Sequence, residues 1–223
     1  MAKRSKSKDR CERCCIRRLL CLCSVIPEMH LSTKLIVLIH NRETRRPTNT
    51  GRLATLALPH SELRVRGLRT PMNEEGLVVS DRQTLLLYPD ENAVELSPSY
   101  VASFKKPITL IVPDGSWRQA AKMRFRVPAL KDVPHVKIPM GAKSNYQLRQ
   151  ETKENGLATF EAIARAFGII ESPEVQQRLE DFFKIMVERT MWSRGKKLAE
   201  DCESPIPPEA ILFNSNAGHA GSR

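Results

Sequence analysis

Two uninterrupted apolar stretches limit the fold more than any other feature of the sequence. KLIVLIH spans Lys34–His40 and ITLIVP spans Ile108–Pro113, and both are rich in β-branched residues. Strands that are apolar on both sides are typical of a parallel sheet covered on both faces. Shorter stretches at residues 62–67, 84–89 and 134–139 predict three further strands. The chain therefore predicts an α/β fold.

Segments with helical character alternate with these strands. We expect helices at residues 51–59, 90–96, 116–126, 155–167 and 174–192. Such alternation predicts a mostly parallel sheet with helices on both faces. No apolar run approaches the roughly 20 residues of a membrane span, and no signal-peptide segment follows the basic start. We therefore expect a soluble cytoplasmic protein that contacts no membrane.

Five cysteines lie within residues 11–23 and predict a metal site. Cys11 and Cys14 form a C-x-x-C pair, and Cys21 and Cys23 form a C-x-C pair. Four thiolates on two short turns are typical of a structural zinc knuckle. Cys15 could replace Cys14 as a ligand, and an iron–sulfur cluster is an alternative. A disulfide framework is excluded, because disulfides persist in oxidising compartments and nothing in the sequence suggests secretion.

The chain divides into three expected parts. Residues 1–30 form a basic segment with the four-cysteine knuckle, residues 31–200 form the catalytic domain, and residues 201–223 form a flexible tail.

The positive charge falls in blocks. The formal net charge is +11, and residues 1–20, 42–69 and 118–149 carry net charges of +6, +5 and +7. Basic blocks that fold onto one face attract phosphate groups, which predicts a nucleic-acid partner. Charge alone leaves RNA and DNA open, and it leaves open a basic surface without a specific partner.

Polar residues follow four of the predicted strands. Ligands of parallel α/β sheets bind at the carboxyl ends of the strands, so we expect a site there. The candidates are His40–Arg42, Tyr88–Asp90, Asp114–Trp117 and Met140–Asn145. Asp114 alone is more typical of a helix cap than of a catalyst, and His40 is more typical of a structural histidine. The sequence contains neither G-x-G-x-x-G nor G-x-x-x-x-G-K-[ST], so neither nucleotide-binding fingerprint is present.

Several motifs occur together in a specific order. After the cysteine pairs come HNRETRRPTNTGRLATLAL at residues 40–58, YPDE at 88–91, PDGSW at 113–117 and RQETKENGLATFEA at 149–162. This set resembles the DTW-domain family, named for an Asp-x-Thr-Trp signature, over roughly residues 11–192. Ser116 stands where the family name has threonine, and serine keeps the hydroxyl.

The resemblance implies a fold and an activity. The family has a SPOUT-like α/β fold, which implies a knot at the cofactor site. Its bacterial members are tRNA-uridine aminocarboxypropyltransferases, which move the 3-amino-3-carboxypropyl group of S-adenosyl-L-methionine to N3 of a uridine in the tRNA variable loop. The alternatives are an RNA methyltransferase of the same fold and a non-catalytic zinc-knuckle RNA-binding protein. We expect a monomer that acts on tRNA and binds structural zinc (Zn2+).

The resemblance also implies residue roles. Asp114 is the candidate catalytic group that accepts or orients the N3–H of uridine. The expected cofactor-binding residues are Tyr88, Pro89, Pro113, Gly115, Ser116, Trp117, Met140, Gly141 and Asn145. The expected RNA-binding residues are Arg42, Arg45, Arg46, Arg52, Arg118, Lys143 and Arg149. The expected metal ligands are Cys11, Cys14, Cys21 and Cys23.

Overall fold

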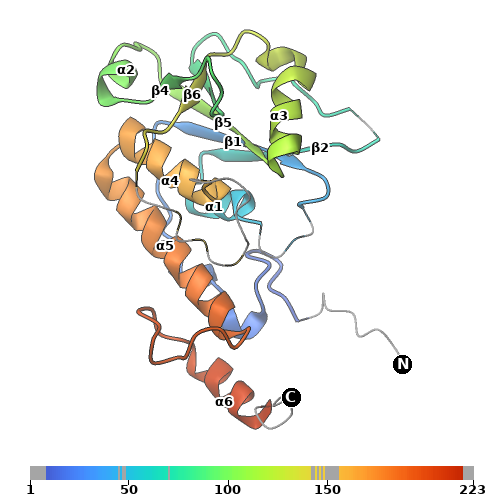
Figure 1. Ribbon diagram of the computed structural model, residues 1–223, viewed down its shortest axis with the longest axis vertical. Helices are drawn as coiled ribbons and strands as arrows, with labels where there is room; N and C mark the ends of the chain where they lie inside the picture. Colours follow the sequence, from blue (N-terminus) through green and yellow to red (C-terminus); the bar gives the residue numbers. More distant parts are fainter. Residues whose placement is uncertain are drawn as a thin grey trace.

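A six-stranded parallel sheet forms the centre of the computed structural model (Figure 1). The structure describes residues 9–44, 46, 49–69, 71–141, 144, 146, 148 and 156–217, without the side chains of 214–217. The strands are β1 (Lys34–His40), β2 (Ser61–Arg66), β3 (Gln83–Leu87), β4 (Val94–Glu95), β5 (Ile108–Asp114) and β6 (His135–Lys137). Their order is β2-β1-β5-β3-β6-β4, and all of the paired strands run parallel. The predicted fold class is confirmed.

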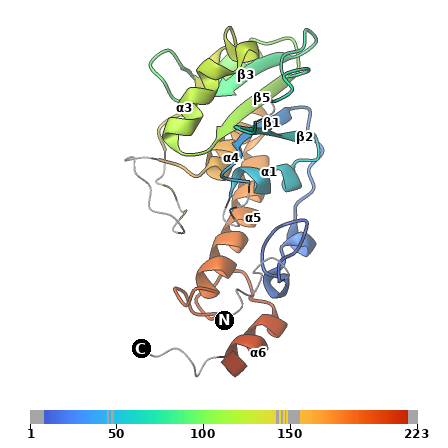
Figure 2. The ribbon, with the colours of Figure 1, turned by 90° about the vertical axis from the view of Figure 1, so that its right-hand side faces the viewer.

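Helices cover both faces of the sheet, as the sequence predicts. One face packs against α1 (Gly51–Ala57), α4 (Thr159–Ile170) and α5 (Pro173–Trp192), and the other packs against α3 (Trp117–Arg126) (Figure 2). Successive side chains of β1 point to opposite faces of the sheet, which explains the two hydrophobic cores. Leu35 and Val37 join the first cluster, whereas Ile36 and Leu38 join the second. Two short helices, α2 (Pro98–Ala102) and α6 (Pro208–Ala217), complete the α-helices described.

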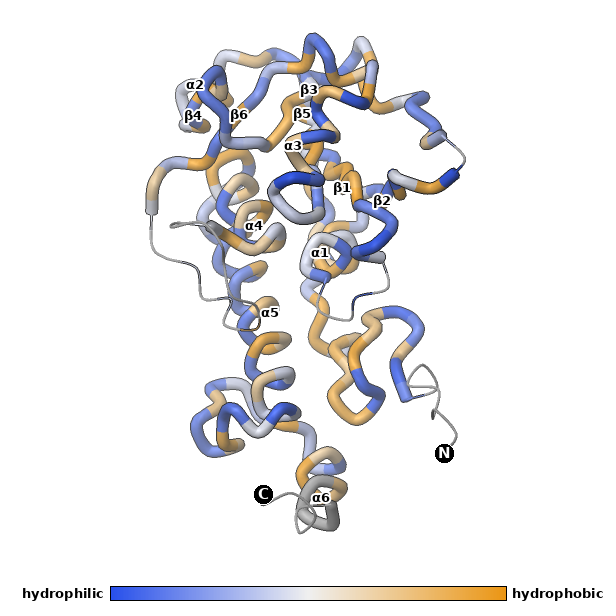
Figure 3. The backbone as a smooth tube through the Cα atoms, turned by 45° about the vertical axis from the view of Figure 1, so that its right-hand side comes forward, coloured by the Kyte–Doolittle hydropathy of each residue, from blue (hydrophilic) through white to orange (hydrophobic). Residues whose placement is uncertain are grey.

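An N-terminal knuckle, residues 9–25, packs beside α5. It contains the 3₁₀ turns Arg18–Leu20 and Cys23–Val25. Leu20 and Leu22 are buried in the same cluster as Met186 of α5. Figure 3 shows apolar segments in β1, in β5 and in the knuckle, all of which contribute to this cluster. The knuckle is therefore joined to the main core.

Two expectations about helices need correction. The helix expected at residues 90–96 is wrong, because this segment forms a turn and then β4, which pairs with β6. The acidic residue that suggested a helix start, Asp90, binds Arg124 and His135 instead. α4 begins at Thr159, later than expected, and residues 151–155 lie outside the described residues.

The C-terminal residues contain more structure than the flexible tail that was expected. α6 occupies residues 208–217, and Ile206 and Ala210 are buried in the main core. The predicted knot stays a prediction, since much of the chain between β6 and α4 lies outside the described residues. Among the described residues, none of the helices combines the length and apolar character that crossing a membrane requires.

Candidate functional site

A cavity of about 790 Å³ opens where β1, β3, β5 and β6 end. Because the strands are parallel, their carboxyl ends meet at one edge of the sheet, where ligands of α/β proteins bind. Eight of the nine residues expected to bind cofactor line this cavity. They are Tyr88, Pro89, Pro113, Gly115, Ser116, Trp117, Met140 and Gly141. The ninth, Asn145, lies outside the described residues.

The basic residues expected to bind RNA are spread over several places. Arg42 and Arg46 line the cavity, and Arg46 forms an ion pair with Glu43 at 3.1 Å. Arg52 donates from Nη2 to two knuckle carbonyls, and Arg118 is exposed on α3. Arg45, Lys143 and Arg149 lie outside the described residues. The structure thus brings two of the seven together at the cavity.

Asp114 is the last residue of β5 and is almost fully buried, at 5% exposed. Thr159 donates from Oγ1 to Oδ1 of Asp114 at 2.6 Å, and Asn49 donates from Nδ2 to Oδ2. Gly51 packs directly on this carboxyl group, since a Cβ at residue 51 would lie 2.8 Å from Cγ of Asp114. The carboxylate is thereby held between the first turns of α1 and α4, on the wall of the cavity.

The helix cap belongs to Ser116 rather than to Asp114. The Ser116 hydroxyl accepts from the Gln119 N–H at 3.4 Å, and Gln119 Oε1 accepts from the Ser116 N–H at 2.7 Å. This reciprocal pair is a capping box, which threonine forms equally well. Serine in place of the family threonine therefore preserves the start of α3, and the cap interpretation of Asp114 is wrong.

His40 holds the turn that follows β1. Its Nδ1 accepts from the Arg42 N–H at 3.2 Å. Burial, followed by the nearby charge of Arg42, lowers the pKa of His40 below its usual value. An imidazole that accepts a backbone hydrogen bond in its neutral form supports the structural interpretation.

The sequence interpretation missed several cavity residues, among them Glu43, Thr159 and Arg165. Thr159 lies within the ATFEA motif, which the sequence treated only as part of a helix. The start of α4 there is marked by Glu161, whose Oε2 accepts from the Ala158 N–H at 2.9 Å. An acidic residue in the first turn was the available signal, since Glu161 lies three positions after the N-cap residue Ala158.

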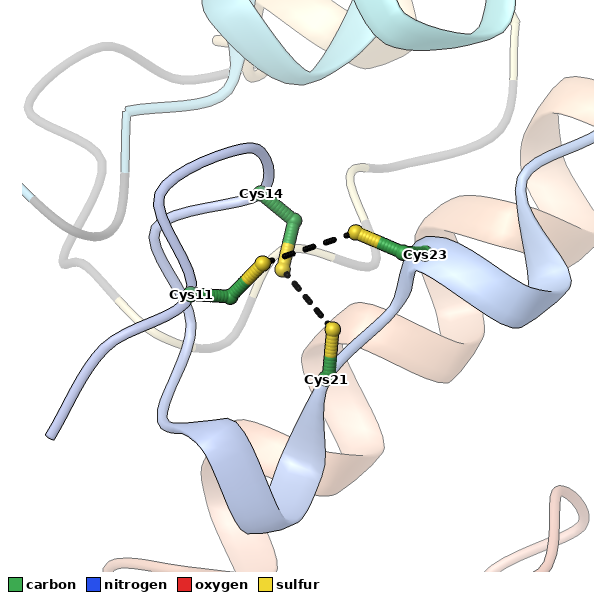
Figure 4. Close-up of side chains that lie close together, drawn as sticks. All are labelled: Cys11, Cys14, Cys21 and Cys23. Atoms are coloured by element: carbon green, nitrogen blue, oxygen red, sulfur yellow. Dashed lines mark hydrogen bonds between the residues drawn. The ribbon is translucent and has the colours of Figure 1, made fainter.

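The four predicted metal ligands come together in the knuckle (Figure 4). Their sulfur atoms all lie within 4.8 Å of one another, with 3.5 Å between Cys11 and Cys23 and 3.7 Å between Cys14 and Cys21. A tetrahedral zinc ion with Zn–S bonds of about 2.3 Å requires S–S separations of about 3.8 Å. Cys15 Sγ points instead toward the Glu12 carbonyl oxygen at 3.9 Å. The geometry fits zinc, and it favours Cys14 over Cys15 as the fourth candidate ligand.

The electrostatics of the knuckle also suit a bound cation. The backbone N–H of Cys14 lowers the pKa of Cys11 to about 6, whereas burial raises the pKa of Cys23 to about 12. Four adjacent thiolates need a nearby positive charge in order to coexist. Arg189 of α5 lies beside them, with Nη1 donating to the Cys21 carbonyl oxygen at 2.6 Å. This buried guanidinium offsets part of the negative charge that a four-thiolate zinc site retains.

The parallel sheet, its strand-end cavity and the four-cysteine knuckle define a class: α/β domains that have a ligand-sized cavity at one sheet edge and a cysteine cluster suited to a metal ion. Within this class, residues 8–191 match the DTW domain. The chain therefore belongs to the DTW-domain family.

Three curated relatives of the chain are named as tRNA-uridine aminocarboxypropyltransferases. A tRNA-uridine aminocarboxypropyltransferase 2 from Drosophila melanogaster is 32% identical over 180 residues, which cover 77% of this chain and 71% of the relative. The protein of the same name from Macaca fascicularis is 28% identical over 75% of this chain and 58% of its own length. A tRNA-uridine aminocarboxypropyltransferase A from Arabidopsis thaliana is 27% identical over 79% of each chain. These relatives are animal and plant proteins, so a bacterial type stays a prediction.

One solved structure shows a distant likeness. It is the SAM-dependent rRNA:acp-transferase Tsr3 from Vulcanisaeta distributa, which is 16% identical with a TM-score of 0.48. The similarity covers 83% of this chain and 93% of that structure.

Proposed function

We propose that this protein transfers the 3-amino-3-carboxypropyl group of S-adenosyl-L-methionine to N3 of a uridine in tRNA and releases methylthioadenosine. One observation carries the proposal: the family signature segment Asp114–Trp117 lies on the wall of the strand-end cavity. Three relatives named for this activity support it. The uridine is expected in the variable loop, as the family resemblance implies.

The cavity has the size and lining for a small co-substrate. Ligand sites in proteins usually measure about 300–1,000 Å³, and this one measures about 790 Å³. Leu87, Val112 and Ile138 give apolar surface, while Arg42 and Arg165 bring positive charge. Enzymes that act on a base take it out of the stack into such a pocket. The space therefore suits both a nucleoside co-substrate and an extruded uridine.

The chemistry is a displacement at the γ-carbon of the methionine group. A bond forms between uridine N3 and this carbon while the bond from the carbon to sulfur breaks, so the sulfonium leaves as a neutral thioether. The N3 proton must leave as the new bond forms, and we assign to Asp114, on the cavity wall, the role of accepting or orienting it. Such general-base help contributes about 10²–10⁴-fold to a rate, and fixed orientation adds to it.

The charge of the chain supports tRNA as the partner, and the geometry of the cysteine sulfur atoms supports zinc as the metal. A net charge of +11 favours a polyanion such as tRNA, and Arg42 and Arg46 bring positive charge to the cavity. Zinc bound by the four knuckle cysteines would have a structural role, because a site filled by four protein ligands leaves no open position for a substrate. We expect the protein to work as a cytoplasmic monomer.

A labelling experiment separates this activity from methyl transfer. Unmodified tRNA is incubated with S-adenosyl-L-methionine labelled either in the methyl group or in the carboxypropyl carbons. The proposal requires that only the carboxypropyl label enters tRNA. Label from the methyl group alone would identify a methyltransferase, and binding of tRNA without either label would identify a non-catalytic RNA-binding protein.

A further inference from the structure

The carboxylate of Asp90 joins three elements at one point behind the cavity. Its Oδ2 accepts from Nη1 of Arg124 on α3 and from Nδ1 of His135 on β6, the latter at 2.6 Å. Its Oδ1 accepts from the Asn92 N–H at 3.0 Å, which fixes the turn that follows β3. Asp90 belongs to the YPDE motif, yet it does not line the cavity itself. Its side chain therefore connects the turn after β3 to α3 and to β6.

The same three elements supply three sides of the cavity. The lining includes Tyr88 and Pro89 directly before Asp90, Trp117 at the start of α3, and residues 138–141 after β6. A contact between these elements fixes how far apart the corresponding walls lie. The Asp90 carboxylate is thus in a position to set the shape of the cavity without touching a ligand in it.

Arg124 links Asp90 to one particular cavity residue. Its guanidinium carbon lies over the Tyr88 ring, 5.0 Å from the ring centroid. A cation in this position is attracted to the face of an aromatic ring. Tyr88 is almost fully buried and packs in the same hydrophobic cluster as Met123 of α3. Arg124 therefore supports the Tyr88 ring in the cavity wall.

The place of Arg124 depends in turn on Asp90. Nε of Arg124 is buried and has no hydrogen-bond partner among the residues that the structure describes. A guanidinium removed from water needs an opposite charge nearby. Burial raises the pKa of Asp90, but the hydrogen bond and the charge of His135 outweigh it and hold this pKa below its usual value. The carboxylate is thereby kept ionised and can hold Arg124 over the ring.

We infer that Asp90 is a positioning residue for S-adenosyl-L-methionine, which acts through Arg124 to fix Tyr88 in the cavity wall. The inference rests on the proposed transferase function and adds a determinant of co-substrate affinity to it. A wall that is already ordered does not lose side-chain entropy when the ligand binds. Because neither Asp90 nor Arg124 lines the cavity, their effect on affinity has to pass through a residue that does.

The test measures S-adenosyl-L-methionine affinity of the full-length protein by calorimetry. Arg124→Met keeps the length of the side chain and removes its charge, and Asp90→Asn removes the charge that holds Arg124. We expect each substitution to weaken binding at least about fivefold, as loss of a partly buried cation–π contact or charged hydrogen bond would. In a Tyr88→Leu protein, Arg124→Met should cause little further loss, because the ring that it supports is absent. A purely structural role would lower the stability of the variants to denaturant and leave the affinity of the folded protein unchanged.

Arg126→Met is the matched control. Arg126 is exposed on the same helix and does not line the cavity, so this variant should bind like wild type. Wild-type affinity in folded Arg124→Met, or in Asp90→Asn if the Met variant does not fold, would overturn the inference. An equally large loss from Arg124→Met with and without Tyr88 would overturn it too.

The wild-type protein separates this inference from the proposed function. A wild-type protein that binds S-adenosyl-L-methionine but transfers no aminocarboxypropyl group would overturn the proposed function alone. A wild-type protein without affinity for S-adenosyl-L-methionine would overturn both.

Discussion

Loss of Cys21, one of the four proposed zinc ligands, should unfold the knuckle and leave the sheet intact. The four sulfur atoms come from two short turns, and the apolar side chains beside them are few. Ile16, Leu20 and Leu22 are the buried ones, and burial of three such side chains contributes roughly 5–9 kcal/mol. Ordering the fifteen residues from Cys11 to Val25 costs roughly 15–30 kcal/mol in backbone entropy. Burial alone is therefore too small to order this segment.

Zinc bound by the four cysteines would supply the missing stabilisation. Structural zinc binds four-ligand peptides with about 10–16 kcal/mol at neutral pH, which brings the two sides of the balance close together. Cys21→Ser removes one thiolate, so the variant should lose most of this free energy. The segment should then unfold, and Arg189 should lose its hydrogen bond to the Cys21 carbonyl oxygen.

Two measurements follow this change. Metal analysis should find about one zinc ion per wild-type chain and much less in Cys21→Ser. Hydrogen exchange should show lost protection in peptides from residues 11–25 and unchanged protection in β5. Cys15→Ser is the matched control, because Cys15 Sγ points away from the other sulfurs. Equal zinc content in Cys15→Ser and Cys21→Ser, or a wild-type protein purified without chelator and still free of zinc, would refute the reasoning.

Two further substitutions test the site and the fold. Asp114→Asn should lower the rate of single-turnover transfer by at least about 10²-fold. The affinity for S-adenosyl-L-methionine, measured by calorimetry, should stay nearly unchanged. Near-normal turnover in a folded variant would remove Asp114 from the mechanism. Burial raises the pKa of Glu188, but hydrogen bonds from Lys197 and Ser204 outweigh it and lower that pKa from 4.5 to about 2. A lowered carboxyl pKa stabilises the fold above the unfolded value, here by roughly 3 kcal/mol, and this stability is lost as the pH falls from about 4.5 to 2. Denaturant unfolding should therefore show Glu188→Gln less stable by about that amount at pH 7 and equal to wild type near pH 2; a difference independent of pH would contradict the assignment.

The central strands were predictable because their environment leaves a simple signature. β1 and β5 are buried on both faces, so they appear as continuous apolar runs, and the predicted bounds agree with the structure to within one residue. β4 has only two residues and both are exposed, so no stretch of apolar residues in the sequence indicates this strand. Its place in the sheet depends on pairing with β6, which is a tertiary contact.

The candidate site was predictable in part for a similar reason. Strand ends are local features, so Tyr88, Asp114 and Met140 could be placed at one sheet edge before the structure was known. Thr159 lies 45 residues from Asp114 in the sequence, and the bond between them arises only when α4 packs beside β5. The bond from Asn49 likewise spans 65 residues. Partners of a buried carboxylate depend on such long-range contacts, which local patterns do not encode.

Product analysis of a single reaction tests the central claim most directly. The purified protein is mixed with unmodified tRNA and S-adenosyl-L-methionine, and both the tRNA nucleosides and the small-molecule products are identified by mass spectrometry. The proposed function predicts one uridine per tRNA that gains an aminocarboxypropyl group, together with an equal amount of methylthioadenosine. A uridine that gains a methyl group with release of S-adenosylhomocysteine, or tRNA that binds and remains unchanged, would contradict it.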